Sequence, residues 1–160
     1  MNQYRPDIDG LRAISVLLVL FFHANIFGIS SGFIGVDIFF VISGYLITSG
    51  IQNNLEKNKF SFVEFFKRRL WRLQPVFIAL LLVTALMTTA TYLPDDYLRY
   101  TESAQFATQI RANQYFSGLE TGYFAQDSGL MPLLHTWSLS IEWQWYLLLP
   151  FLMFFSTLLK

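Results

Sequence analysis

The chain has 160 residues, of which 54% are hydrophobic and only 14% are charged, whereas a typical soluble domain carries roughly 25% charged residues. Its formal net charge is zero and it has no cysteine. Bulk charge therefore indicates no nucleic-acid partner, and disulfides, thiolate nucleophiles and Cys-based metal sites are excluded. The hydrophobic residues fall in blocks long enough to matter to a bilayer.

Four of these blocks approach the roughly 20 apolar residues that a helix needs to cross a membrane. The predicted spans are residues 11–28, 33–51, 75–92 and 134–158. Backbone polar groups inside a bilayer must bond internally, which favours helices. We therefore predict an all-α fold, a multi-pass transmembrane helical bundle. The first block has no small-residue cleavage pattern, so we interpret it as a retained span.

The connections between the blocks differ in kind. Residues 28–32 form a very short turn, which predicts an antiparallel hairpin of the first two helices. Residues 60–73 mix aromatic and basic side chains, a pattern typical of a helix lying at the membrane interface. Residues 93–131 are mixed and polar, and we count no span there, although residues 104–115 come closest.

The basic residues predict the orientation of the chain. With four spans, nine of the eleven lie on one side: Arg5, Arg12, Lys57, Lys59, Lys67, Arg68, Arg69, Arg72 and Lys160. Only Arg99 and Arg111 fall on the other side. Because Lys and Arg concentrate in cytoplasmic loops, we expect the N-terminus to face the cytoplasm.

Ionisable residues in the first two spans are candidate functional groups. Arg12 and His23 are eleven positions apart, almost three helical turns, so they share one face. The hairpin is expected to bring Asp37 to a depth similar to that of His23, where a carboxylate would orient the imidazole as a general base. The alternatives are that Arg12 extends to lipid phosphates, His23 packs against a carbonyl and Asp37 caps its helix.

The last span adds His135 and Glu142, which are seven positions apart and share one helical face. His135 has an alternative interpretation as an interfacial residue in an aromatic belt. Glu142 lies several residues inside the span and is harder to explain without a function. The spacings of the histidines and carboxylates fit no metal-ligand signature, so we predict no metal site.

A basic run precedes the third span and contains Lys67, Arg68, Arg69 and Arg72. One interpretation is topology and anionic membrane lipid. The sharper one is a site for a phosphorylated cytoplasmic ligand, because the guanidinium fork binds phosphate through two hydrogen bonds.

Several motifs together resemble the membrane acyltransferase-3 family. They are Tyr4 to Ala13 followed by His23, Gly32 to Ile47, Phe65 to Pro75, and Pro132 to Glu142 continuing to Gln144 and Tyr146. They occur in family order and cover nearly the whole chain. One departure is Trp143, which stands where many members carry a second acid after Glu142.

The resemblance implies a bacterial inner-membrane enzyme that O-acylates, most often O-acetylates, exported carbohydrates such as lipopolysaccharide O-antigen or peptidoglycan. The donor it implies is cytoplasmic acyl-CoA, most simply acetyl-CoA, with no bound cofactor. Family domains have about ten spans, so residues 1–160 are expected to be the N-terminal part of one transmembrane domain, with no second domain in this chain. Family members with this style of N-terminus often carry a C-terminal extracytoplasmic SGNH hydrolase-like domain.

The resulting hypothesis assigns roles to eight residues. Those expected to hold the acyl-CoA phosphates are Arg12, Arg68, Arg69 and Arg72. Those expected at the reacting end are His23 as general base or acyl carrier, Asp37 as its orienting group, and His135 and Glu142 at the acceptor. The competing hypothesis is a membrane scaffold or inactive remnant. A transporter is disfavoured because no internal repeat is found.

Overall fold

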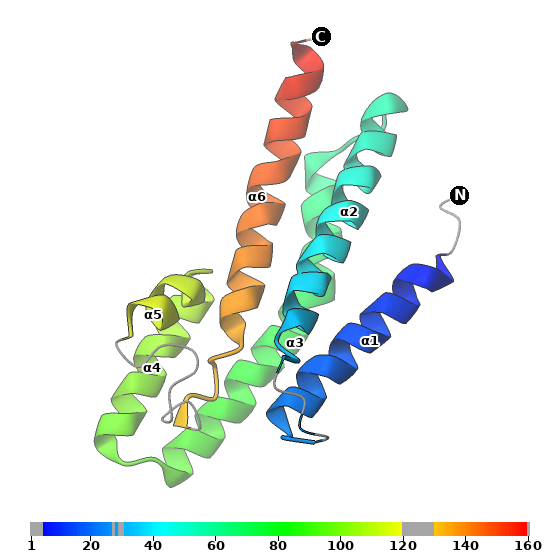
Figure 1. Cartoon of the computed structure of the whole chain (residues 1–160). Coiled ribbons are helices and arrows are strands. Elements are labelled where there is room, and N and C mark those ends of the chain that lie inside the picture. Colours follow the sequence, from blue (N-terminus) through cyan, green and yellow to red (C-terminus); the bar gives the residue numbers. More distant parts are fainter. Residues whose placement is uncertain (1–4, 27, 29–30, 120–129, 160) are drawn as a thin grey trace. The chain divides into compact units, whose positions relative to one another are not determined.

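A computed structural model describes residues 5–26, 28, 31–119 and 130–159. These residues contain six helices and no strand (Figure 1): α1 (Pro6–His23), α2 (Ile34–Glu56), α3 (Phe62–Thr91), α4 (Pro94–Thr108), α5 (Ala112–Gly118) and α6 (Thr136–Leu158). The all-α prediction is confirmed for this part of the chain. The helices belong to two compact units, Met1–Asn58 and Lys59–Lys160.

The first helix begins earlier than the predicted span. Pro6 occupies its first turn, where the missing N–H costs nothing, and acidic residues follow it in the same turn. Arg5, just before the helix, forms an ion pair with Asp7 at 2.7 Å and a hydrogen bond with the Tyr45 hydroxyl of α2 at 3.4 Å. The start of α1 is thus tied to the middle of α2.

The Arg5 guanidinium lowers the pKa of Asp7 to about 2 through its hydrogen bonds to the carboxylate. Asp7 lies outside the predicted span, and the depressed pKa means that its stabilising effect is present above the unfolded value near 3.9 and is lost as pH falls through about 2. We expect an NMR titration of the Asp7 carboxyl carbon to show this midpoint. Arg5→Gln should return it toward the ordinary value, and an unchanged midpoint would refute the pairing.

The predicted hairpin is formed by close contact between α1 and α2. An ideal Cβ added to Gly32 would lie 2.5 Å from the Phe22 Cβ, and one added to Gly35 would lie 2.5 Å from the Ser15 carbonyl oxygen. The later glycine, Gly35, thus contacts an earlier part of α1 than Gly32 does, so the two helices are antiparallel. Backbones approach this closely only where small residues line the contact.

The third helix differs from its prediction. The sequence predicted an interfacial helix over residues 60–73 and a separate span from residue 75, but α3 is one helix of 30 residues with Pro75 in its interior. Its start is capped by Ser61, whose hydroxyl accepts a hydrogen bond from the Glu64 N–H at 3.4 Å. Proline inside an apolar helix is tolerated when neighbouring groups compensate the freed carbonyl.

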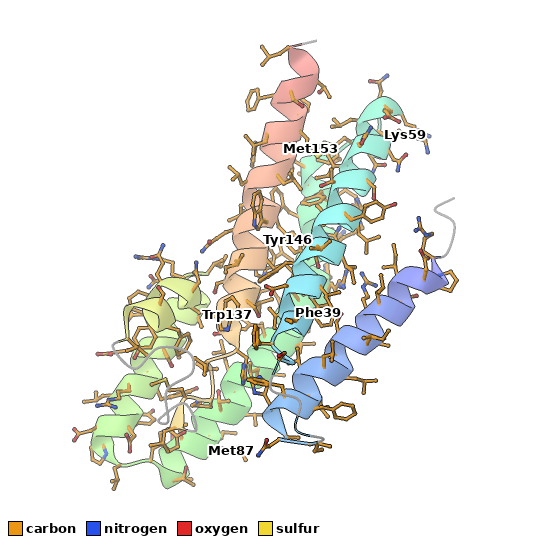
Figure 2. All side chains as sticks on the ribbon, in the orientation of Figure 1. Phe39, Lys59, Met87, Trp137, Tyr146 and Met153 are labelled. Carbon is orange, nitrogen blue, oxygen red and sulfur yellow. The ribbon has the colours of Figure 1, made fainter. Side chains whose placement is uncertain are left out.

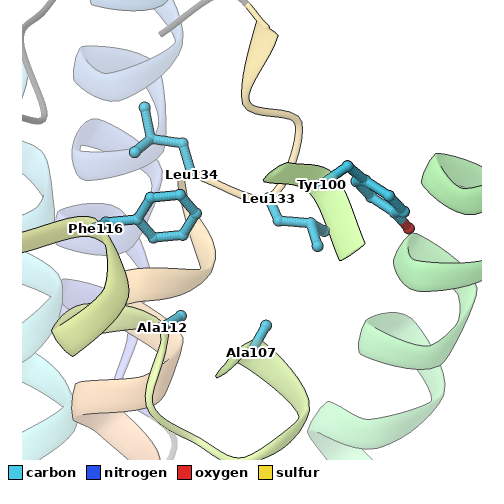
Figure 3. Packing of buried hydrophobic residues seen from close by; sticks show 6 residues of the cluster. All are labelled: Tyr100, Ala107, Ala112, Phe116, Leu133 and Leu134. Atoms are coloured by element: carbon cyan, nitrogen blue, oxygen red, sulfur yellow. The ribbon is translucent and has the colours of Figure 1, made fainter. Parts of the chain in front are cut away.

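The second unit has its core at the end of α3, where residues 93–131 were predicted only as a mixed polar stretch. Six buried residues from α4, α5 and the segment before α6 pack together (Figure 3): Tyr100, Ala107, Ala112, Phe116, Leu133 and Leu134. The Tyr100 hydroxyl lies 3.1 Å from the Thr84 hydroxyl of α3, which ties this core to the long helix.

Polar contacts join α5 to α6. The Ser140 hydroxyl accepts a hydrogen bond from the Ala112 N–H at 3.2 Å. The Gln144 amide donates to the Ile110 carbonyl at 2.9 Å and to the Asn113 side chain at 3.1 Å. These bonds satisfy backbone groups at the start of α5 and fix the first half of α6 against the core.

Two helices among the described residues are long and apolar enough to cross a membrane, α2 and α3. This test rests on length and composition. Of the four predicted spans, two therefore coincide with helices that could cross a membrane, and the bundle of four spans stays a prediction. Helix α1 ends at His23, so part of the predicted span 11–28 lies outside it, and α6 covers most of the predicted span 134–158.

Candidate functional site

Arg12 and His23 lie on one face of α1, as the sequence predicted. Arg12 and His23 lie on one uninterrupted helix, with His23 as its last residue, exposed and packed edge-to-face against Phe22 at 5.1 Å between ring centroids. Arg12 is partly exposed and pairs with Asp9 at 3.3 Å. An exposed pair of this kind contributes roughly 0–1 kcal/mol, so an anionic ligand can displace it.

The hairpin register separates Asp37 from His23 along the helix axis. Gly35 faces Ser15, which precedes His23 by eight residues, and Asp37 lies two residues further along α2. Asp37 is exposed and lies on the order of 10 Å along the axis from His23. The prediction of similar depth is therefore wrong, because the close contact at Gly35 sets the register, and Asp37 is nearer to the level of Arg12.

Two of the predicted phosphate-binding arginines lie on the surface of α3. Arg68 and Arg72 are exposed and one turn apart, so their guanidinium groups share a face. Arg68 pairs with Glu64 at 3.1 Å, and both side chains of this pair are more than half exposed. Like the pair on α1, this contact is weak enough to be exchanged for a phosphate.

Arg69 has a different environment from its neighbours. Its guanidinium carbon lies 5.4 Å from the ring centroid of Phe65 and 5.3 Å from that of Tyr146 on α6. Its buried Nε has no hydrogen-bond partner among the described residues. The side chain is a cation held between two aromatic rings, whereas Arg68 and Arg72 are open to solvent.

Glu142 lies inside α6 and is partly buried. It accepts a short hydrogen bond from the hydroxyl of Tyr146, one turn later on the same helix. Tyr146 is only 2% exposed and lies near the middle of α6 (Figure 2). His135 is exposed and stands at the N-cap of α6, just before the helix.

The predicted site residues thus form two groups, one in each unit. Arg12, His23 and Asp37 belong to the first. The second brings together two residues that the sequence analysis assigned to opposite ends of the reaction, Arg69 and Glu142, through a residue to which it gave no role, Tyr146. The spacing of Glu142 and Tyr146, four positions on one helix, is a signal that could have revealed their contact.

Comparisons with known proteins agree with these motifs. The family described as an acyltransferase domain matches residues 5–160. The chain is 41% identical over 154 residues to the O-acetyltransferase OatA of Staphylococcus aureus strain NCTC 8325 / PS 47, covering 96% of this chain and 25% of that protein. A provisionally named O-acetyltransferase of strain MSSA476 is 42% identical over 151 residues, covering 92% of this chain and 24% of that protein.

The chain therefore spans about a quarter of the length of these relatives. No solved structure matches it.

Proposed function

The chain belongs to the acyltransferase-domain family that matches residues 5–160, and we propose that its intact protein transfers an acetyl group from cytoplasmic acyl-CoA to a hydroxyl of an exported carbohydrate. The observation that carries this proposal is the 41% identity to an O-acetyltransferase over 96% of the chain. The proposed setting is the bacterial plasma membrane, because the family match and the two apolar helices α2 and α3 indicate a membrane protein.

A donor on the cytoplasmic side is supported by the charge distribution. Nine of the eleven basic residues fall on one side of the predicted spans, and cytoplasmic loops are enriched in Lys and Arg. The arginines proposed to bind the phosphates of acyl-CoA are Arg12, Arg68, Arg69 and Arg72. Arg12 and Arg68 would exchange their weak ion pairs for phosphate oxygens.

The chemistry proposed for His23 is acid–base or covalent. As a general base, the imidazole accepts the proton of the sugar hydroxyl while the hydroxyl oxygen attacks the thioester carbon. The new C–O ester bond forms, the C–S bond breaks, and the proton passes to the CoA thiolate. Alternatively, the imidazole first takes the acyl group and releases CoA, and the sugar hydroxyl then attacks the acyl-imidazole.

His135 and Glu142 are proposed to act at the acceptor. His135 stands just before α6 and Glu142 lies in its N-terminal half. A carboxylate and an imidazole both accept hydrogen bonds from hydroxyl groups, and sugars present hydroxyls in fixed geometry. They would orient one hydroxyl toward the acyl carbon.

The decisive measurement is mass spectrometry of surface glycans from cells that carry or lack the complete gene. We expect the O-acetyl mass increment to disappear on deletion and to return when the gene is restored. The same comparison identifies the acceptor glycan, because only the acceptor loses the increment.

A matched control keeps the protein and changes an exposed apolar residue. A restored copy carrying Leu20→Ala, on the same helix as His23 and 52% exposed, should return the O-acetyl mass fully. Unchanged glycans after deletion, with the wild-type protein present in the membrane beforehand, would exclude the acyltransferase proposal and favour a membrane scaffold.

A further inference from the structure

Tyr146 contacts two residues of the candidate site at once. Its hydroxyl donates a hydrogen bond to Glu142, and its ring faces the guanidinium of Arg69 at 5.3 Å. Under the proposed function these two residues serve different substrates, since Arg69 lies among the donor-binding arginines and Glu142 lies at the acceptor. Tyr146 is the point where the two ends meet.

The position of the Tyr146 ring is tightly defined. The ring is 2% exposed, and the indole of Trp143 packs edge-to-face against it at 5.7 Å. Helices α3 and α6 run antiparallel, since Phe62 stacks on Phe151 at 5.0 Å while Arg69 reaches Tyr146. The ring therefore has neighbours on two sides and little freedom to rotate.

The Tyr146 hydroxyl contacts a residue nearer the start of α6. Glu142 precedes Tyr146 by one turn, about 6 Å of helix axis, on the side away from the chain's basic segment. The hydroxyl holds one carboxylate oxygen, which fixes the direction of the other. A carboxylate fixed in this way can accept a hydrogen bond from a substrate hydroxyl without first losing rotational freedom.

The Arg69 contact adds the second link. The guanidinium is held between the Phe65 and Tyr146 rings, and its buried Nε lacks a hydrogen-bond partner within the described part of the chain. A cation over an aromatic face is attracted by the ring quadrupole, and the attraction grows as water is excluded. The ring whose hydroxyl positions Glu142 therefore also holds the Arg69 guanidinium in place.

We propose that Tyr146 is a positioning residue that couples Arg69, on the donor side, to Glu142, on the acceptor side. The inference rests on the proposed function, and it assigns no bond-making step to Tyr146. The hydroxyl orients Glu142 for the acceptor, and the ring orients Arg69 for the donor. Loss of the hydroxyl and loss of the ring should therefore affect different kinetic constants.

The test separates the hydroxyl from the ring in the full-length protein, assayed in membrane vesicles with acetyl-CoA and the acceptor glycan. Tyr146→Phe keeps the ring and removes the hydroxyl, so kcat should fall about 10-fold while the KM for acetyl-CoA stays within about twofold. Tyr146→Leu also removes the ring, so the KM for acetyl-CoA should rise as well.

A double-mutant cycle tests whether the hydroxyl acts through Glu142. Combining Tyr146→Phe with Glu142→Gln should lower kcat no further than Glu142→Gln alone, because the group that the hydroxyl orients has already been changed. A merely structural role predicts losses that multiply. Tyr97→Phe, at an exposed tyrosine on α4, is the matched control and should retain wild-type kinetics.

The outcomes distinguish the two levels of the proposal. A wild-type protein that transfers acetyl groups, with Tyr146→Phe equally active or with multiplicative losses in the cycle, overturns the role of Tyr146 alone. A wild-type protein that transfers nothing from acetyl-CoA overturns the proposed function, and this inference with it.

Discussion

Replacing His23 with alanine in the intact protein should abolish acyl transfer. Removing a general base typically lowers the rate by about 10²- to 10⁴-fold, which corresponds to about 3–5 kcal/mol of transition-state stabilisation. Loss of a covalent acyl carrier would be at least as severe, because no imidazole remains to take the acyl group. The measurement is acetyl transfer to the acceptor glycan, normalised to the amount of protein in the membrane.

The position of His23 makes a structural explanation of such a loss easy to exclude. It is the last residue of α1 and is exposed, so its truncation removes no buried core and leaves the hairpin contact at Gly35 intact. The Leu20→Ala protein, altered one turn earlier on the same helix, should remain active. Substantial transfer by His23→Ala would end the assignment of His23 to the reaction.

The parts of the fold that were predictable depend on local patterns. The short connection after the first block and its flanking apolar residues predict the α1–α2 hairpin, and α2 extends over the predicted span. Arg12 and His23 share a helix because their separation is close to a whole number of turns. These features need no knowledge of which helices pack together.

The parts that were not predictable depend on packing between helices. The level of Asp37 follows from the contact of Gly35 with Ser15, which no turn length specifies. A proline is usually taken as a helix boundary because it removes a hydrogen bond, yet α3 continues through Pro75. Arg69 is partly buried because it packs against Tyr146, a residue 77 positions later in the sequence.

The sequence also missed the helices within residues 93–131. Helices α4 and α5 are short and carry polar residues, so they resemble loop sequence when judged for membrane crossing. Their apolar residues are few and become meaningful only when Leu133 and Leu134 complete the same core. A core assembled from three separate segments leaves no strong periodic signal in any one of them.

Gly35→Ala should destabilise the protein strongly, although alanine is the better helix former. In an isolated helix the exchange would gain about 1 kcal/mol. At this position the added Cβ would lie 2.5 Å from the Ser15 carbonyl oxygen and 2.8 Å from the Val19 Cγ2. A backbone oxygen cannot rotate away, so the helices must separate, and overpacking of this kind typically costs about 1–3 kcal/mol or more.

Gly44 supplies the control, because it lies in the same helix and an added Cβ there would meet nothing within 4 Å. Gly44→Ala should be neutral or stabilising by up to about 1 kcal/mol, so the two variants should differ by about 2–4 kcal/mol. Detergent-based unfolding of the intact protein measures the difference, and equal stabilities would contradict the close contact. Because the same hairpin carries Arg12 and His23, Gly35→Ala should also lower acyl transfer, while Gly44→Ala should not.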